Sequence, residues 1–373
     1  FGIRDFAMMY YLHHLSGKFI GFNVFLYVTF RAIAAAVTAF LTTLMFGNFI
    51  IAKLRALRVE QPIRGAAEVH RLAELQSVKQ GTPTMGGVLV IGAVFVSSIL
   101  WARLDNKFVW LALFSMVYLG GLGFADDYLK VTKKKSEGIH GRIKLLFQII
   151  LAAAITGLFL TDPLLEVQAR ALYVPFVKAP VIANMSWFTF VFFVLVIVGT
   201  SNAVNLTDGL DGLATGCTIT VAFAYALLCY AAGNFRVAEY LQVPFYPFAG
   251  ELTVVCSALI GAGLGFLWFN CYPAKVFMGD TGSLAIGGML GVIAICCKQE
   301  LLLVVVGGVF VIEAVSVILQ VLSFKLTGKR FFVMSPLHHH FELTGWKETT
   351  VIVRFWILAI IFALLGLATL KLR

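Results

Sequence analysis

The chain has 373 residues, of which 60% are hydrophobic and only 13% are charged. Soluble domains carry about 25% charged residues, so this composition excludes a soluble enzyme, a disordered chain and a collagen-like fibre. The formal net charge is +10. In a membrane protein an excess of Lys and Arg collects in cytoplasmic loops, so we interpret the charge as a topology signal and expect no nucleic-acid partner.

Apolar stretches recur along the chain at lengths near the roughly 20 residues that a transmembrane helix needs. An outer-membrane barrel is excluded, because its strands are alternating segments of about 10 residues. The predicted spans are residues 22–50, 84–102, 107–129, 143–161, 187–205, 212–233, 252–270, 283–298, 301–325 and 351–370. We therefore expect an all-α, polytopic membrane protein of about ten spans, with residues 1–373 forming a single domain.

The basic residues orient these spans. Most of the 29 Lys and Arg residues fall in the odd-numbered loops, above all in residues 51–83 and 130–142. Because loops rich in Lys and Arg stay in the cytoplasm, the pattern predicts cytoplasmic odd-numbered loops and periplasmic termini. No internal repeat is visible, which disfavours a secondary transporter built from two similar halves.

Acidic side chains lie at the ends of several predicted spans, on the face that this topology makes cytoplasmic. They are Asp126 and Asp127 after the third span, Asp208 and Asp211 after the fifth, and Asp280 before the eighth. Carboxylates gathered at one face repel each other unless a cation joins them. Carboxylate oxygens favour Mg²⁺ or Mn²⁺ over zinc, and Mg²⁺ leaves coordination positions open to phosphate oxygens. The sequence therefore predicts a site for a diphosphate substrate.

Each acidic motif also has a structural interpretation. Asp126 and Asp127 could end a span in water, and the Asp and Gly residues of 208–212 could form two tight turns. Asp280 could be the N-cap of a helix. The sequence leaves these alternatives open.

Other polar residues stand near or within the ninth span. His338, His339 and His340 are a weak zinc signal, because neighbouring side chains point in different directions, but an imidazole can donate a hydrogen bond to phosphate. Glu313 and Gln320 share one face of a helix, and we expect a buried hydrogen-bonded pair or a groove lining. The six cysteines show no metal-ligand spacing and are expected to be free thiols.

Six motifs together resemble one enzyme family. They are residues 81–87 (GTPTMGG), 126–128 (DDY), 202–212 (NAVNLTDGLDG), 265–270 (GFLWFN), 273–283 (PAKVFMGDTGS) and 336–342 (PLHHHFE). From about residue 22 to its end, the chain resembles the phospho-N-acetylmuramoyl-pentapeptide transferases (translocase I). These belong to the polyprenyl-phosphate N-acetylhexosamine 1-phosphate transferases. The histidine segment is typical of the muramoyl-pentapeptide branch.

The resemblance implies a homodimer in the bacterial cytoplasmic (inner) membrane, with ten spans and a cytoplasmic active-site groove open to lipid. It implies transfer of phospho-MurNAc-pentapeptide from UDP-MurNAc-pentapeptide to undecaprenyl phosphate, giving lipid I and UMP in peptidoglycan synthesis. The implied cofactor is Mg²⁺, with Mn²⁺ as a substitute. Two rivals stay open: a transferase of the same fold that uses UDP-N-acetylglucosamine, and a cation-coupled transporter.

The resemblance also assigns residues. It makes Asp280 the Mg²⁺ ligand and assigns catalytic roles to Asp126, Asp127, Asp280, His338, His339 and His340. The implied substrate-binding residues are Lys79, Thr84, Lys130, Lys134, Asn202, Asn205, Asp208, Gly209, Leu210, Asp211, Asn270 and Phe277. The lipid phosphate could attack directly or after a covalent aspartyl intermediate. We favour direct attack, because a phosphate monoester with a second pKa near 6 is mostly deprotonated at neutral pH.

Overall fold

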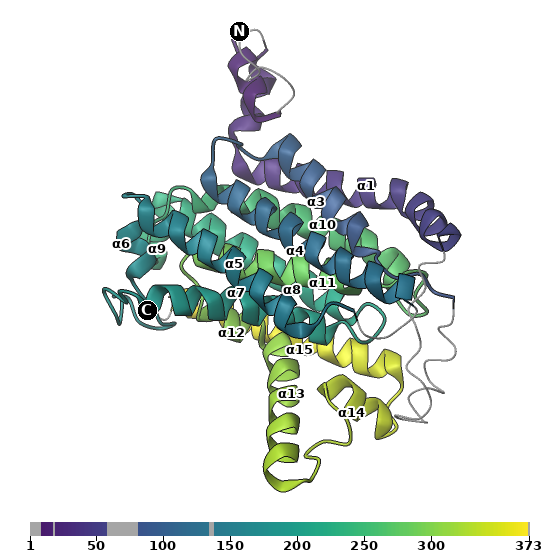
Figure 1. Ribbon diagram of the computed structural model, residues 1–373. Coiled ribbons are helices and arrows are strands. Elements are labelled where there is room, and N and C mark those ends of the chain that lie inside the picture. The colour runs from purple at the N-terminus through teal and green to yellow at the C-terminus, as the bar shows by residue number, and fades with distance from the viewer. Residues whose placement is uncertain (1–8, 18, 58–80, 134–137, 372–373) are drawn as a thin grey trace.

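The computed structural model describes residues 9–17, 19–57, 81–133 and 138–371 (Figure 1). Two 3₁₀-helices, η2 (Met9–Leu15) and η3 (Ile20–Leu26), precede the first long helix. Within these ranges the chain is helical, and its β pairing is one isolated bridge between Leu172 and Ile182. The prediction of an all-α fold is confirmed.

Each predicted span contains an apolar helix, and the ninth contains two, α12 and α13. Among the described residues, 9 helices are long and apolar enough to cross a membrane, and α3 (Gly87–Trp101) is a shorter apolar helix. The long helices are α1 (Val28–Ala56), α4 (Lys107–Lys133), α5 (Gly141–Thr161), α7 (Phe188–Thr207), α8 (Leu213–Gly233), α10 (Leu252–Asn270), α11 (Gly279–Cys296), α13 (Gly308–Thr327) and α15 (Glu348–Ala368). Lipid offers no hydrogen-bond partners to backbone N–H and C=O groups, whereas a helix pairs these groups within itself. These apolar stretches therefore fold as helices.

Short helices lie between the long ones. They are α6 (Glu166–Arg170), α9 (Phe235–Leu241), η4 (Ala249–Glu251), α12 (Leu302–Val306), α14 (Leu337–Leu343) and η5 (Thr369–Lys371). All six cysteines are free thiols, as predicted.

Two predicted spans differ in their boundaries. The first helix begins at Val28 instead of residue 22, because η3 occupies residues 20–26. At its other end it continues to Ala56. The ninth stretch is not one helix but breaks at Gly307, between α12 and α13. Glycine pairs favour sharp kinks, and the Phe362 ring fills the space that a side chain at Gly308 would need. Figure 1 shows the result: α13 runs crosswise to the bundle and projects from it.

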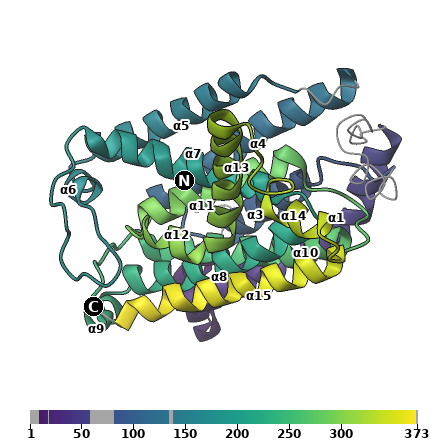
Figure 2. The same ribbon diagram turned by 90° about the horizontal axis from the view of Figure 1, so that it is seen from below.

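The core of the bundle lies around α11. This helix packs against α4, α7 and α3, and Figure 2 shows it among them, inside the outer ring of helices. Most of its residues are buried, many of them small residues such as Gly287 and Ala294. Its first turn carries Asp280, so the most enclosed helix of the molecule begins with a carboxylate.

At the other end of the bundle, a buried ion pair ties three segments together. Arg31 in the first turn of α1 donates to both carboxyl oxygens of Glu251 in η4, at 2.7 and 2.6 Å. The backbone N–H of Arg103, after α3, donates to the same carboxylate at 3.1 Å. The charges lie away from water, with 2% and 11% of the two side chains exposed, so each depends on the other.

We expect Glu251→Gln to lower the thermal unfolding midpoint of the detergent-solubilised protein by several degrees. The variant leaves the Arg31 charge buried and unpaired, which typically costs about 3–5 kcal/mol. The double variant Arg31→Met/Glu251→Leu is expected to recover part of the loss. Asp105→Asn is the control, because Asp105 pairs with Arg103 at the surface and exposed pairs contribute little. An unchanged midpoint in Glu251→Gln would contradict the prediction.

Candidate active site

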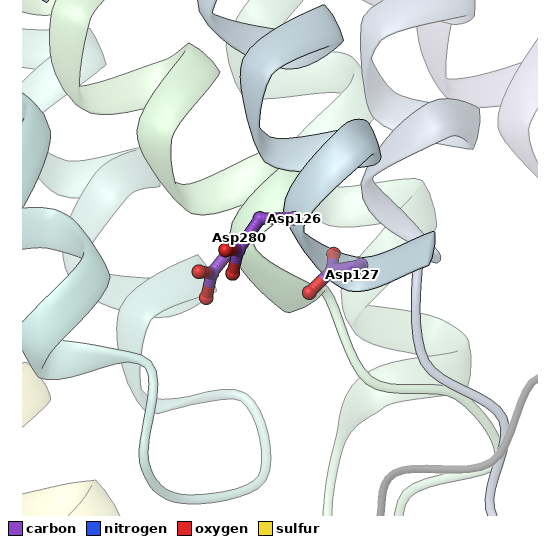
Figure 3. Close-up of side chains that lie close together, drawn as sticks. All are labelled: Asp126, Asp127 and Asp280. Atoms are coloured by element: carbon purple, nitrogen blue, oxygen red, sulfur yellow. The ribbon is translucent and has the colours of Figure 1, made fainter. Parts of the chain in front are cut away.

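Three carboxylates meet where α4 ends and α11 begins. Asp126, Asp127 and Asp280 each offer an oxygen, and these oxygens all lie within 4.8 Å of one another. Figure 3 shows Asp126 and Asp280 side by side, with Asp127 on the same turn of α4. Only 0%, 4% and 16% of the side chains of Asp126, Asp127 and Asp280 are exposed. Asp126 and Asp127 therefore do not end a span in water, and that alternative is wrong.

A glycine makes this contact between helices possible. Gly123 lies one turn before Asp127 on α4, and a Cβ atom there would stand 2.1 Å from the backbone oxygen of Asp280. Any side chain at position 123 would push α4 away from the first turn of α11. The absence of a side chain thus sets the distance between the carboxylates.

Two lysines bind this carboxylate cluster (Asp126, Asp127 and Asp280). Lys130, one turn beyond Asp126, and Lys144, in the first turn of α5, donate to Asp280 Oδ2 at 3.0 and 2.8 Å. Both ammonium groups also lie 2.7 Å from Asp126 Oδ2, as ion pairs without hydrogen-bond alignment. Against three negative charges, the two positive charges leave one negative charge uncompensated. Nothing in the sequence separates Lys144 from the other basic residues of its loop.

The two aspartates of α4 have different partners. Asp127 Oδ2 accepts hydrogen bonds from the backbone N–H of Thr281, at 3.0 Å, and from its hydroxyl, at 2.8 Å. Asp126 Oδ1 accepts the backbone N–H of Ile139 at 2.6 Å. This bond holds the residues directly before α5 against α4. Asp127 is thus fixed to α11 and Asp126 to the segment that leads to Lys144.

Asp208 lies next to the cluster. It follows α7, and its carboxyl group lies near the backbone of Gly279, directly before Asp280. Although the side chain keeps some exposed surface, removal from water and the charges of Asp280 and Asp127 raise the pKa of Asp208 to about 8. A fourth negative charge is therefore costly here, and a bound cation would favour it.

The segment of residues 83–87 pairs with the backbone directly before Asp280. Phe277 donates its backbone N–H to Pro83 O at 2.8 Å, and Gly86 donates to Phe277 O at 2.8 Å. Thr84 is buried and its hydroxyl faces Gly279, where a Cβ atom would stand 2.8 Å away. Gly279 has a positive φ of 72°, which glycine adopts readily. The N-cap of α11 is Met278. The interpretation of Asp280 as the N-cap of a helix is therefore wrong.

Asp211 and Asn270 hold the loop before α11. Asp211 Oδ2 accepts the backbone N–H of Ala274 at 2.9 Å. Asn270 donates to Val276 O at 2.9 Å and accepts from the hydroxyl of Thr215 at 2.9 Å. The turns that the sequence allowed in residues 208–212 are present, with Gly212 at a φ of 76°, and the same segment also contributes acidic groups to the site.

Asn202 is oriented by a second residue of α5 that the sequence did not single out. Its amide donates to Gln148 Oε1 at 2.9 Å, and Gln148 is 1% exposed. Gln148 lies one turn beyond Lys144 on the same face of α5, so one helix face serves two parts of the site. Asn205 lies in the last turn of α7, and Leu210 lies in the turn that follows this helix, next to Asp208 and Asp211 in the chain.

The three histidines have three different partners. His338 Nδ1 lies 3.2 Å from Glu313, His339 Nδ1 lies 2.8 Å from Glu342, and His340 Nδ1 accepts the backbone N–H of Val333 at 3.3 Å. Among the described residues the carboxylate cluster is the one candidate metal group. Burial lowers the pKa of His339, although its hydrogen bond to Glu342 acts in the opposite direction.

Glu313 and Gln320 do not bind each other, contrary to one expectation. Gln320 Oε1 accepts the backbone N–H of Phe332 at 2.8 Å, and its amide donates to Phe332 O at 3.0 Å. Glu313 accepts the N–H of Leu337 at 2.7 Å. Gln320 thus fastens the segment before α14 to α13, and Glu313 fastens the first turn of α14.

Two predicted residues, Lys79 and Lys134, lie outside the described residues. The predicted groove at the site stays a prediction. The structure describes two cavities away from the carboxylates, one of about 510 Å³ beside Tyr173 and one of about 470 Å³ beside Arg31 and Glu251.

Comparison with known proteins extends over nearly the whole chain. The model of the family "Glycosyl transferase family 4" matches residues 109–298, which include the carboxylate cluster. A "Phospho-N-acetylmuramoyl-pentapeptide-transferase signature 1" matches residues 79–91. A protein of Methylacidiphilum infernorum named phospho-N-acetylmuramoyl-pentapeptide-transferase is 57% identical over 98% of this chain and 100% of its own length. The chain belongs to the phospho-N-acetylmuramoyl-pentapeptide-transferase family.

Further members of this family are similarly close. Proteins of the same name from Geobacter sp. and Syntrophus aciditrophicus are 52% and 50% identical over 98% of this chain and 100% of their own lengths. The transferase signature contains residues 83–87, which pair with the segment before Asp280. In this member of the transferase family the signature thus supports the carboxylate cluster.

We expect Gly123→Ala to abolish the activity proposed below, because the added methyl group collides with the backbone of Asp280. Gly121→Ala is the matched control, because nothing lies within 4 Å of a Cβ at that position of the same helix. Enzyme turnover and the amount of folded protein in size-exclusion chromatography are measured for both variants. Full turnover in Gly123→Ala would show that the helix contact does not set the geometry of the site.

We expect Lys144→Met to reduce turnover about tenfold or more, since it doubles the uncompensated negative charge of the cluster. Lys144→Arg keeps the charge and is expected to lose less. The control is Lys107→Met, which removes a mainly exposed lysine that pairs with Asp162. If Lys144→Met and Lys107→Met behave alike, Lys144 has no part in the site.

Proposed function

We propose that the protein transfers phospho-MurNAc-pentapeptide from UDP-MurNAc-pentapeptide to undecaprenyl phosphate, releasing UMP and forming lipid I. The observation that carries this proposal is the match, at 57% identity and over full length, to a protein named for that transfer. The carboxylate cluster with its two lysines supports it, because the chemistry joins two phosphate-bearing anions. The proposed setting is a bacterial cytoplasmic membrane, with this end of the bundle in the cytoplasm and two copies forming a dimer.

Repulsion between donor and acceptor is the main obstacle to this reaction. Lys130 and Lys144 supply two positive charges at the cluster, and lysine ammonium groups bind phosphates as point charges. A site at the membrane end of the helices lets the lipid tail of the acceptor stay in hydrocarbon while its phosphate reaches a water-soluble nucleotide.

We propose that the carboxylate cluster holds Mg²⁺, with Asp280 as a ligand. The fit rests on three carboxylates within 4.8 Å of one another, because Mg²⁺ prefers oxygen ligands from one or two carboxylates, and on the negative charge that the two lysines leave uncompensated. Bound Mg²⁺ would polarise the diphosphate and stabilise the charge that develops on the departing UMP.

We propose that the acceptor phosphate attacks directly. One of its oxygens forms a bond to the sugar-linked phosphorus, and the bond from that phosphorus to UMP breaks, with the electron pair leaving on UMP. The aspartates are poor candidates for a covalent nucleophile, because Asp127 accepts two hydrogen bonds and Asp126 lies against two ammonium groups. Accumulation of labelled phospho-sugar on the protein without lipid acceptor would overturn this step.

The test is release of UMP by the purified protein in detergent. Release is expected to require both undecaprenyl phosphate and UDP-MurNAc-pentapeptide, and to be far slower with UDP-N-acetylglucosamine. Preference for UDP-N-acetylglucosamine would favour the related transferase, and no release with either donor would overturn the proposal. Cross-linking of the purified protein tests the dimer.

We expect Asp280→Asn to lower turnover at least about a hundredfold, because the variant removes a metal ligand and leaves the lysines in place. A Mg²⁺ titration from micromolar to millimolar concentrations measures the loss. Asp105→Asn, at a surface ion pair of the opposite end, is the control and is expected to titrate like the unaltered protein. The metal assignment is wrong if Asp280→Asn responds to Mg²⁺ in the same way.

A further inference from the structure

A buried carboxylate on α13 takes no part in the proposed chemistry. Glu313 lies in the second turn of this apolar helix, and its side chain is 0% exposed. A carboxylate in such surroundings is costly unless it has partners. Its partners are therefore the first indication of its role.

Glu313 caps the helix that carries the histidines. Its Oε2 accepts the backbone N–H of Leu337 at 2.7 Å, and its Oε1 accepts that of His338 at 3.2 Å. These are the first two N–H groups of α14, and the residue before them, Pro336, offers no side-chain cap. A negative charge at a helix N-terminus is stabilising, so α13 supplies the cap that α14 lacks.

The same carboxylate faces the imidazole of His338. Glu313 Oε2 lies 3.2 Å from His338 Nδ1, and the ring is fully buried. Among the described residues neither ring nitrogen has a hydrogen-bond partner in good alignment, which is costly for a buried polar group. A small rotation of the ring would direct an Nδ1–H onto Glu313.

The other side of the ring lies against the turn that carries Asp208. A Cβ atom at Gly209 would stand 2.2 Å from His338 Nε2, so only glycine allows the ring this position. Asp208, the residue before it, lies near the backbone of Gly279, directly before Asp280, and the charge of Asp280 acts on it. An unbroken series of contacts thus runs from α13 through His338 to the Asp208–Gly209 turn and on to the carboxylate cluster.

We propose that Glu313 is a positioning residue that acts through His338. It holds the Nδ1 proton of His338 and so fixes the ring against Gly209, which sets the position of Asp208, a residue that the family resemblance assigns to substrate binding and that we place on the side of the nucleotide donor. The inference rests on the proposed function for the identity of the substrates. It predicts that loss of Glu313 impairs use of the nucleotide donor and spares use of the lipid acceptor, because the contacts pass through Asp208 and not through Lys130 or Lys144.

A double-mutant cycle separates positioning from simple capping of α14. Glu313→Gln keeps one oxygen, for the backbone N–H of His338, but turns an amide N–H toward Nδ1 and toward the backbone N–H of Leu337. We expect the KM for the nucleotide donor to rise about tenfold, with the KM for the lipid acceptor and kcat changing less than about threefold. In a His338→Ala background Glu313→Gln is expected to have no further effect, because the residue through which it acts is missing.

Gln320→Ala is the matched control, because Gln320 fastens the segment directly before α14 to α13, through Phe331 and Phe332 and not through His338. Its donor KM is expected to stay within about threefold of the unaltered value. The proposal is overturned if the effects of Glu313→Gln and His338→Ala multiply, if the acceptor KM rises as much as the donor KM, or if Gln320→Ala reproduces Glu313→Gln.

A second measurement does not depend on turnover. In protein labelled with ¹⁵N-histidine, the ring-nitrogen shifts of His338, assigned by their loss in His338→Gln, are expected to show a protonated Nδ1. In Glu313→Gln they are expected to change to the neutral tautomer with the proton on Nε2. A neutral Nε2–H ring in the unaltered protein would overturn the proposal. If the unaltered protein releases no UMP, the proposed function fails while this measurement still decides the role of Glu313.

Discussion

The architecture depends on bringing three carboxylates together inside an apolar bundle. Asp126, Asp127 and Asp280 repel one another, and helices that carry them separate unless other interactions hold them. The close approach at Gly123 and the two lysines supply those interactions. The enclosed position of α11 follows from the same requirement, because only a helix packed on several sides keeps its first turn fixed against α4.

Polar side chains elsewhere hold irregular backbone in place. Asp211 and Asn270 bind the loop before α11, Gln320 binds the segment before α14, and Glu313 binds the first turn of that helix. Irregular backbone near a bilayer needs partners within the protein, because lipid offers none. These polar residues therefore hold backbone segments in position.

The sequence predicted most of the helices and the gathering of Asp126, Asp127 and Asp280 at one end of the bundle, for a physical reason. Hydropathy is a property of each segment alone, and span ends on one face had to lie at one end of the bundle. Lys144 and Gln148 could not be identified this way, because their roles depend on how α5 packs against α4 and α7. The break at Gly307 and the partners of Glu313 were also out of reach, since each is decided by residues distant in the chain.

The ammonium groups of Lys130 and Lys144 already offset most of the charge of the carboxylates without any added ion. The polypeptide can thus complete its folding with the carboxylate cluster in place, and binding of the proposed Mg²⁺ would be a separate, later event. If the cluster binds Mg²⁺ as proposed, a cell short of that ion would accumulate idle, folded enzyme instead of unfolded protein.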